Sequence, residues 1–474
     1  MRNILCAATL LFLSACAVGP DYRVPVVPTP VAFEGAADGG FSNNDVEREF
    51  WKLFGDPLLT QIIEDTLAAN HDVRIAAAHL REVRALRGES RFDLAPTITA
   101  SGGYTEARSS ERQAPPALGI GRNQNYYDAG FDAAWELDLF GRVRRGIEAR
   151  SAEVGAAVAD LQNVEVTVTA EAARNYFELR GYQRQLDVAQ RNADNQRKTL
   201  DLTKLRLDTG SGTTLDVARA QAQLSATLAL IPEQEAAVAR ASFRISVLTG
   251  RSPEALVSQL AQLQPPPQLP QVQNIGTPEA LLRRRPDVRA AERQLAAATA
   301  QIGVAIGDLF PRISLTGNWG YDATKSGELG QGSSENYAFG PVIRWAAFDL
   351  GRVRQQIKQR QAATQGALAR YEQTVLQALE ETDGSLVGLV KAVARQGHRR
   401  ESAEASTVAA QLATARFEDG VSDFLTVLDA ERSELEAQNQ LVQSETATAT
   451  ALLSVYKALG GAFSTDAQAK LARD

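Results

Sequence analysis

The residue types that most often carry chemistry are few in this chain and widely separated. Both cysteines, Cys6 and Cys16, fall in the first sixteen residues, so no disulfide framework or cysteine metal site is expected in the body. The three histidines, His71, His79 and His398, form no metal-ligand cluster. We find no glycine-rich phosphate loop, nucleophile elbow or pair of acids in a cleft-like setting. The sequence therefore predicts no catalytic residue, no metal and no cofactor, in a protein that is not an enzyme.

Cys16 is the one reactive side chain with a recognisable context. A positive Arg2 precedes the apolar segment 4–13, which is too short to span a bilayer as a helix. The following Leu13-Ser14-Ala15-Cys16 resembles the bacterial lipobox, in which the cysteine is lipidated and becomes the mature N-terminus. An ordinary secretory signal with a chance cysteine is the alternative interpretation.

The lipobox resemblance divides the start of the chain. We predict a lipoprotein signal peptide at 1–15 and a lipidated Cys16, followed by an N-terminal tether and equatorial segment at 16–70. In the bacterial sorting rule an aspartate directly after the cysteine favours the inner membrane, and here that residue is Ala17. The resemblance thus points to the outer membrane, with its lipid as a partner.

Composition and charge restrict the class of protein. The 474 residues are 44 % hydrophobic and 23 % charged, which suits a packed protein rather than a disordered tail. The net charge of −7 argues against a nucleic-acid partner, which normally requires a basic face. No segment beyond the signal peptide is predicted as a transmembrane helix, so a form that spans a membrane would need strands closed into a barrel.

The chain contains one internal repeat. Asp72-Val73-Arg74 matches Asp287-Val288-Arg289, and Gly141-Arg142-Val143-Arg144 matches Gly351-Arg352-Val353-Arg354. Each half is predicted as a helix, two strands, a very long helix, a tight turn and a returning helix. The predicted divisions are repeat 1 at 71–250, with strands 96–105 and 128–139 and a helical hairpin at 142–250; an equatorial linker at 251–285; repeat 2 at 286–460, with strands 311–322 and 336–348 and a helical hairpin at 351–460; and a C-terminal tail at 461–474.

The predicted strands alternate apolar and polar side chains with period two. Phe131, Ala133 and Trp135 share one face of the second strand, and Asp132 and Glu136 share the other. A soluble sandwich also alternates. A membrane barrel is favoured because the strands are about ten residues long and carry Trp and Tyr near their ends. Four strands cannot close a barrel, so several copies must share one.

The predicted helices are unusually long. Residues 142–209 contain no proline, which predicts a rod on the order of 100 Å. Sharp turns are expected at Gly210 and Gly212 in the first hairpin and at Asp419 and Gly420 in the second, because glycine suits a left-handed C′ position. Helices that are polar nearly all round suit a wall with water on both sides. A plain coiled-coil rod is the alternative, but it leaves the strands without a role.

Three stretches resemble a known family. They are Cys16-Ala17-Val18-Gly19-Pro20-Asp21-Tyr22, the segment 50–58 that begins Phe50-Trp51, and the segment 281–315 that contains Arg285-Pro286-Asp287-Val288-Arg289. Over nearly its whole length the chain resembles the outer-membrane factors of the TolC/OprM/NodT group, closest to the lipoprotein members paired with RND pumps.

The resemblance implies both a fold and a function. The fold class is an α+β membrane protein, a homotrimer with a twelve-stranded β-barrel, four strands per chain, continued by a long periplasmic α-helical barrel. An equatorial belt would come from 23–70, 251–285 and the C-terminal segment. The implied function is the outer-membrane exit channel of a tripartite efflux system, a passive conduit for small toxic compounds or drugs. Its partners would be a periplasmic adaptor, docking at 205–215 and 415–425, and an inner-membrane RND-type pump.

Leu425, Asp429 and Arg432 are the predicted periplasmic gate. They fall at i, i+4 and i+7 and form one stripe at the start of the returning helix. In a trimer this stripe becomes stacked leucine, acidic and basic rings, and by the resemblance this segment constricts the periplasmic end. The residues alone equally allow a solvated i,i+3 ion pair. Arg219 aligns with Asp429 in the first hairpin, so only the second hairpin is expected to line the pore.

Two other functions stay open at this point. One is the exit duct of a protein or polysaccharide secretion system, which shares the same structural class. The other is a periplasmic coiled-coil scaffold without a pore, against which the alternating strands argue. The sequence does not identify the cargo, because a smooth polar tube carries little substrate information.

Overall fold

The computed structural model describes residues 17–36, 40–42, 44, 47, 49–110, 112, 122–265, 267–270 and 274–461. The predicted signal peptide, Cys16 and nearly all of the predicted tail lie outside the described residues. The chain divides into two compact units. Unit 1 holds the residues up to 26, 79–158 and 290–372, and unit 2 holds 27–78, 159–289 and the residues from 373 on. The predicted division followed the two repeats, whereas each compact unit combines parts of both.

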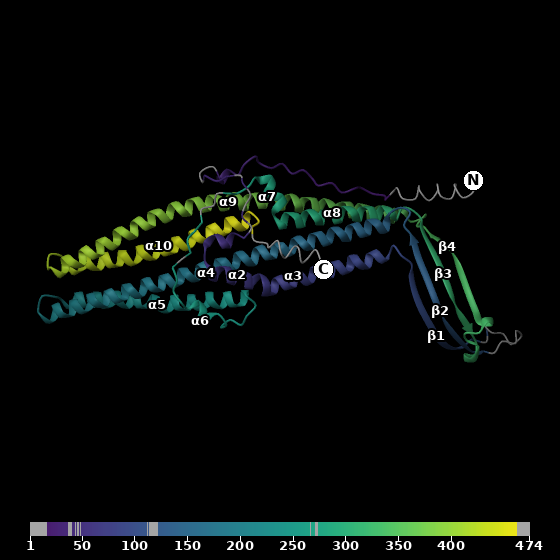
Figure 1. Ribbon diagram of the computed structural model, residues 1–474, viewed down its shortest axis with the longest axis horizontal. Coiled ribbons are helices and arrows are strands. Elements are labelled where there is room, and N and C mark those ends of the chain that lie inside the picture. Colours follow the sequence, from purple (N-terminus) through teal and green to yellow (C-terminus); the bar gives the residue numbers. More distant parts are fainter. Residues whose placement is uncertain are drawn as a thin grey trace. The chain divides into compact units, whose positions relative to one another are not determined.

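The elements repeat in order along the chain. The first series, α3 to α5, is a helix, two strands and a helical hairpin, and α8 to α10 repeats it (Figure 1). The elements are η2 (Glu34–Ala36), η3 (Phe50–Phe54), α2 (Pro57–Ala69), α3 (His71–Phe92), β1 (Thr97–Arg108), β2 (Asn123–Leu137), α4 (Arg142–Asp208), α5 (Thr214–Leu248), α6 (Val257–Leu260), α7 (Pro278–Arg284), α8 (Pro286–Gly307), β3 (Arg312–Ala323), η5 (Ser326–Glu328), η6 (Gly332–Ser334), β4 (Glu335–Arg344), α9 (Leu350–Glu418) and α10 (Phe424–Ala458).

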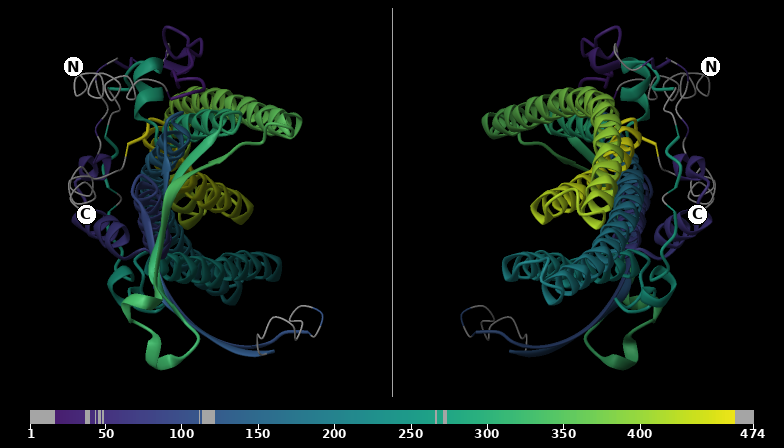
Figure 2. Two further views of the ribbon diagram at one scale, coloured as in Figure 1. Left: turned by 90° about the vertical axis from the view of Figure 1, so that its right-hand side faces the viewer. Right: turned by 90° about the vertical axis from the view of Figure 1, so that its left-hand side faces the viewer.

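Unit 1 contains an antiparallel sheet in the order β1-β2-β3-β4, whose strands bend along their length (Figure 2). The strand bounds differ from those predicted. β2 begins at Asn123 because it pairs with β1 as far as Arg108, and β4 ends at Arg344, opposite the start of β3 at Arg312. Leu139 and Trp345, which continue the predicted apolar faces, therefore lie just beyond the strands.

The sheet presents one apolar and one polar face. On the apolar face, the rings of Phe131 and Trp319 lie directly opposite each other and stack with centroids 6.3 Å apart. Near the ends of β2 and β4, the indoles of Trp135 and Trp345 donate to the backbone carbonyls of Leu94 and Leu309, each just before the preceding strand. The two halves of the repeat thus end their sheets in the same way.

A short ion-paired turn joins the sheet to α4. The guanidinium of Arg142 donates two hydrogen bonds to the carboxylate of Glu136, at 2.9 and 2.7 Å. The carboxylate of Asp138 accepts from the backbone N–H groups of Val143 and Arg144, at 3.0 and 2.9 Å. These N–H groups would otherwise be unsatisfied at the start of the helix, so Asp138 fixes the point at which α4 begins.

Unit 2 has an aromatic core beside a buried arginine, Arg180, whose guanidinium lies 4.9 Å from the centroid of the Tyr176 ring. Phe50 stacks on Tyr456 with centroids 4.7 Å apart, and Phe54 packs on Phe177. Asp56 caps α2 through the N–H of Leu58 and also accepts a hydrogen bond from the hydroxyl of Tyr176.

None of the helices in the described part of the chain combines the length and apolar character needed to cross a membrane.

We predict that Gly320→Ala destabilises the sheet. A Cβ at Gly320 would lie 2.7 Å from the carbonyl oxygen of Ala129 and 2.8 Å from the Cα of Gly130, so the two central strands must separate. The expected loss is about 1–3 kcal/mol, as for other overpacking changes. Gly340→Ala is the matched control, because nothing lies within 4 Å of its added Cβ. Thermal unfolding of the detergent-solubilised protein measures both variants, and equal midpoints would contradict the prediction.

Candidate functional site

The tip of the second hairpin is built by a glycine turn and an aspartate cap. α9 ends at Glu418, and Gly420 takes a left-handed conformation with φ of 76°. The N–H of Val421 then donates to the carbonyl of Arg416 at 2.9 Å, which satisfies the end of α9. Asp423 begins α10 by accepting from the N–H of Thr426 at 3.0 Å. Hydrogen bonds from the Thr426 hydroxyl and N–H hold the pKa of the Asp423 carboxyl below its usual value.

The first tip has the same turn with a different cap. Gly210 has φ of 78°, and the N–H of Gly212 donates to the carbonyl of Arg206 at 2.9 Å. Here Thr213 caps α5 in a reciprocal arrangement with Asp216. Gly210, Asp419 and Gly420 are exposed and Gly212 is partly exposed, so all four predicted tip residues lie at the surface turns.

The predicted gate residues lie on one exposed stripe of α10. Leu425 is 51 % exposed, and the side chains of Asp429 and Arg432 are 70 % and 69 % exposed. The Arg432 guanidinium is 3.4 Å from the Asp429 carboxylate. Leu425 and Asp429 also line a shallow groove between α9 and α10, with Ser406 and Ala409 on its other wall. Within one chain the stripe therefore has only weak internal contacts and is open to a partner.

Arg206 joins the two tips. Its guanidinium donates to the carbonyl oxygens of Phe417 and Glu418, the latter at 3.1 Å, and lies 4.0 Å from the centroid of the Phe417 ring. A cation at the C-terminus of α9 is also favoured by the dipole of that helix. Behind it, a small apolar cluster draws on all four helices of the two hairpins; its members are Ala193, Leu200, Ala220, Leu224, Ala413, Phe417, Phe424 and Val427.

Above this cluster, α4 and α10 meet along a polar seam. The Thr199 hydroxyl donates to the carboxylate of Glu431 at 2.7 Å, and Asn192 donates to Gln438 at 2.9 Å. Glu431 is 8 % exposed, and its burial raises the pKa of the carboxyl. Gln196 is 2 % exposed, and neither amide atom of its side chain has a hydrogen-bond partner among the described residues. Val188 of α4 also packs with Leu435 and Val442 of α10 in a small apolar cluster, so the seam combines polar contacts with apolar packing.

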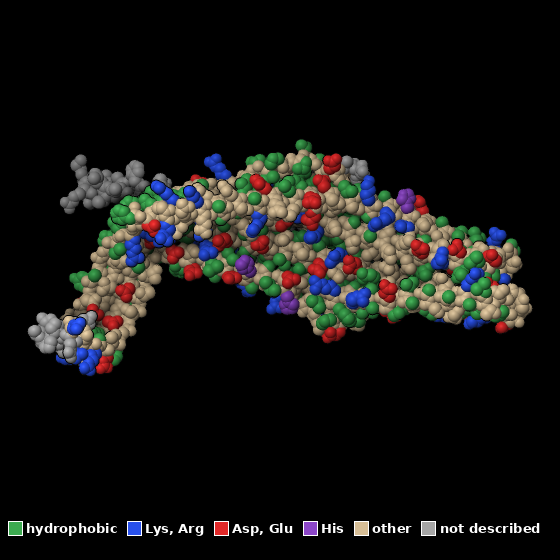
Figure 3. All heavy atoms as spheres, turned by 180° about the vertical axis from the view of Figure 1, so that it is seen from behind, with side chains coloured by type: hydrophobic (Ala, Val, Ile, Leu, Met, Phe, Trp, Pro, Cys, Tyr) green, Lys and Arg blue, Asp and Glu red, His purple; other side chains and the backbone are tan. Residues whose placement is uncertain are grey.

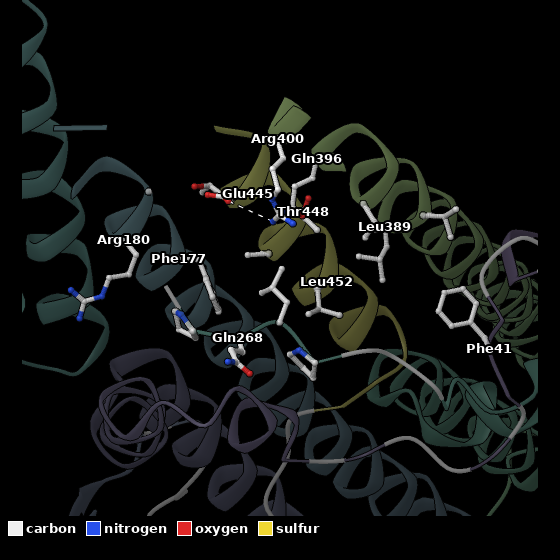
Figure 4. A pocket seen from close by; sticks show the side chains of 18 of the residues that line it. Phe41, Phe177, Arg180, Gln268, Leu389, Gln396, Arg400, Glu445, Thr448 and Leu452 are labelled. Carbon is white, nitrogen blue, oxygen red and sulfur yellow. Dashed lines mark ion pairs between the residues drawn. The ribbon is translucent and has the colours of Figure 1, made fainter. Parts of the chain in front are cut away.

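The seam ends at an ion cluster beside a cavity. Glu445 of α10 pairs with Arg184 of α4 and lies 3.9 Å from Arg400 of α9. These charges border a cavity of about 1070 Å³ between α4, α9 and α10, which Leu389 and Leu452 line from the apolar side (Figure 4).

Charged side chains of both signs cover the helices. Acidic and basic groups are intermixed over the helices on the face shown in Figure 3. Within the residues that the structure describes, no group of three or more His, Cys, Asp or Glu side chains is placed to hold a metal ion.

Sequence reasoning missed the residues that connect the hairpins. It found the tips and the exposed stripe, but not Arg206, Thr199 and Glu431. Arg206 reads as one of many helix-surface arginines, and Glu431 as an ordinary member of a polar helix. Only their partners on another helix distinguish them. The one available signal is a pair of polar residues, Gln196 and Thr199, which lie three residues apart on one face of α4.

Known proteins resemble the chain over almost its full length. The family described as "Outer membrane efflux protein" matches residues 62–251 and 277–461, one match for each half. Nodulation protein T of Rhizobium leguminosarum bv. trifolii is 30 % identical over 97 % of both chains. The toluene efflux pump outer membrane protein TtgC of Pseudomonas putida is 29 % identical, over 96 % of this chain and 94 % of its own. The solved outer-membrane channel OprN is 42 % identical with a TM-score of 0.86, covering 94 % of this chain and 99 % of its own.

We predict that Arg206→Met loosens the second tip. The variant keeps an apolar stem but loses both hydrogen bonds to the end of α9. Loss of one hydrogen bond from a charged donor should speed amide exchange about tenfold. Hydrogen exchange of peptides covering 414–424 measures the change. Arg197→Met is the control, because Arg197 is exposed and pairs only within α4, with Asp194 at 2.6 Å. Equal exchange in the two variants would count against the role of Arg206.

Proposed function

The chain belongs to the outer membrane efflux protein family, and from this premise we propose that it is a trimeric duct, gated at the tip of its second hairpin. It is an outer-membrane efflux channel with a periplasmic helical extension. The fold class predicted from the sequence, with four strands and two long helical hairpins in the described chain, is the fold of these channels. One observation carries this conclusion. The two segments that match the family, 62–251 and 277–461, coincide closely with the two halves of the internal repeat, 71–250 and 286–460.

Two features of the sheet support a closed assembly of three chains. Within the residues that the structure describes, its outer strands, β1 and β4, each leave one edge without a strand partner. Its apolar face is open, with Ile98 68 %, Phe339 74 % and Ile343 66 % exposed. Three copies would pair these edges into a twelve-stranded barrel and turn the apolar faces toward lipid.

The other face of the sheet suits water. Asp128 of β2 lies directly opposite Asp322 of β3. Opposed like charges destabilise a sheet unless solvent separates them. Asp132, four residues further along β2 and on the same face, lies opposite Asn318 of β3. A polar face of this kind fits the inner wall of a water-filled conduit. A periplasmic scaffold without a pore does not require such a face.

The gate is the stripe of Leu425, Asp429 and Arg432. Three-fold symmetry would bring three exposed stripes around one axis and give each charge a neighbour of opposite sign on the next chain. The attraction between Asp429 and Arg432 would then hold the tips together, while repulsion within each ring keeps the closed state marginal. The polar contacts in the seam between α4 and α10 and the small size of the cluster at the tips would let the second hairpin move away from the first.

The partners follow from the position of the tips. A periplasmic adaptor would dock at Gly210, Gly212, Asp419 and Gly420, beside the exposed apolar side chain of Val421. An RND-type pump in the inner membrane would supply cargo, and lipid on Cys16 would anchor the chain. The names of the relatives mention toluene efflux and nodulation, so we propose small molecules as cargo, with selectivity set by the pump and no enzymatic step in the channel.

Removing the gate charges should open the channel. We expect Asp429→Ala with Arg432→Ala to raise the single-channel conductance of the purified trimer in planar bilayers at least about twofold, because the attraction that closes the tip is lost. The control is Asp194→Ala with Arg197→Ala, which removes an exposed i,i+3 pair of α4. A conductance equal to that of the unaltered trimer would contradict the assignment of these residues as the gate.

Replacing the lipidated residue should not release the protein from the membrane. In Cys16→Ser, with its signal peptide processed by the ordinary secretory route, the strands still hold the trimer in the bilayer. We therefore expect extraction from membranes to require detergent, as for the unaltered protein. Extraction by carbonate or salt alone would favour a merely tethered rod and refute the membrane-spanning assignment.

A further inference from the structure

The cavity beside Glu445 lies within unit 2 and has a volume of about 1070 Å³. Gly181 of α4 and Thr446 of α10 both line it, and a Cβ on Gly181 would overlap the side chain of Thr446. The two helices therefore touch at this point, which only the absence of a side chain at Gly181 permits. This contact gives the cavity a floor between α4 and α10.

Two short segments outside the helices, 40–42 and 267–270, form a second wall of the cavity. They lie near the place where Ser42 and Asn274 pair in a parallel bridge. The Ser42 hydroxyl donates to the side-chain oxygen of Asn274 at 2.7 Å, and the N–H of Ile275 donates to the carbonyl of Ser42 at 2.9 Å. These hydrogen bonds fix the second wall, so the cavity is a formed compartment.

One stripe of α9 runs through the cavity from an apolar end to a charged end. Leu389, Val393, Gln396 and Arg400 fall at i, i+4, i+7 and i+11 and therefore share a face of the helix. Leu452 of α10 lies on the apolar side with Leu389 (Figure 4). The side chain of Val393 is 54 % exposed, although it faces a cavity. Apolar surface of this kind favours the carbon skeleton of an organic ligand over water.

The charges that line the cavity are unbalanced. The guanidinium groups of Arg184 and Arg400 share Glu445, the single carboxylate among the described residues of the lining. A third guanidinium, that of Arg180, is 2 % exposed, and its hydrogen bonds go to neutral acceptors such as the hydroxyl of Tyr176. Its Nε has no hydrogen-bond partner among the described residues. Two positive charges are therefore in excess, and a partly enclosed site concentrates their field.

We propose that this cavity binds an amphipathic organic anion, a drug-sized molecule with one carboxylate or sulfonate on an apolar body. The anionic group would lie at Arg400, whose planar fork of N–H donors suits an oxyanion, and the body would lie against Leu389, Val393 and Leu452. Such a ligand contacts α4 of the first hairpin and α9 and α10 of the second, so its binding stabilises their present packing by mass action. The site depends neither on the proposed gate nor on the lipid anchor.

The test uses the full-length trimer in phosphatidylcholine nanodiscs, with 1-anilinonaphthalene-8-sulfonate as the probe. A fluorescence titration, corrected with empty nanodiscs, gives the dissociation constant. N-phenyl-1-naphthylamine has the same rings without the sulfonate, and we expect it to bind at least about tenfold more weakly because it lacks the charge-assisted contact. Hydrogen exchange locates the site, since the sulfonate should slow the amides of peptides covering 386–402 and 441–453.

Two variants separate the charged end from the apolar end. Arg400→Gln leaves the pair of Arg184 with Glu445 intact, and it should raise the dissociation constant of the sulfonate at least about tenfold. Arg395→Gln is the matched control, because Arg395 is an exposed arginine of α9 that does not line the cavity. Val393→Trp fills the apolar end without changing a charge, and it should abolish binding.

Three results would overturn the proposal. One is equal affinity for the two probes, which would mean that the site does not select an anion. Another is an affinity in Arg400→Gln or Val393→Trp equal to that of the unaltered trimer. The third is exchange protection that leaves both peptides unchanged, which would place the bound probe elsewhere.

Discussion

The unpaired edges of the four-stranded sheet are the constraint on which the rest of the structure depends. Every backbone N–H and C=O on the outer sides of β1 and β4 needs a partner, and inside a bilayer water cannot supply one. The opposed carboxylates of Asp128 and Asp322 require water on one face, and the apolar face requires lipid on the other. A sheet with these needs is complete only when further copies of the chain pair with its edges.

The two helical hairpins meet a different requirement. Long polar helices have little apolar surface to bury, so their contacts are sparse and specific. Apolar packing between them includes the small cluster near the tips and a second one of Val188, Leu435 and Val442, and the seam also holds the polar contacts of Thr199 with Glu431 and of Asn192 with Gln438. Such an interface fixes the register of the helices and adds little stability. It suits a part of the molecule that changes conformation.

The turn between β2 and α4 connects the sheet to the first long helix. Glu136 and Asp138 bind the first residues of α4, and one turn later Arg145 binds the backbone carbonyls of Val18 and Gly19. Charged groups stand here because three backbone segments end their regular hydrogen bonding within a few residues of one another. Side-chain donors and acceptors replace the missing backbone partners. The segment 17–22, the end of a strand and the start of a long helix are thereby held at one place.

The sequence by itself determined the features that depend on local patterns. Period-two alternation placed all four strands, the absence of proline placed α4 and α9 to within a residue or two, and Gly210 and Gly420 marked the turns. Tertiary structure decided what depends on residues far apart in the chain. It set the strand ends, which follow the register of the neighbouring strand, and the pairing of Arg206 with the end of α9 and of Arg145 with Asp21. A long-range ion pair leaves no periodic signal, because each partner has the same composition as its exposed neighbours and differs only in what lies opposite it.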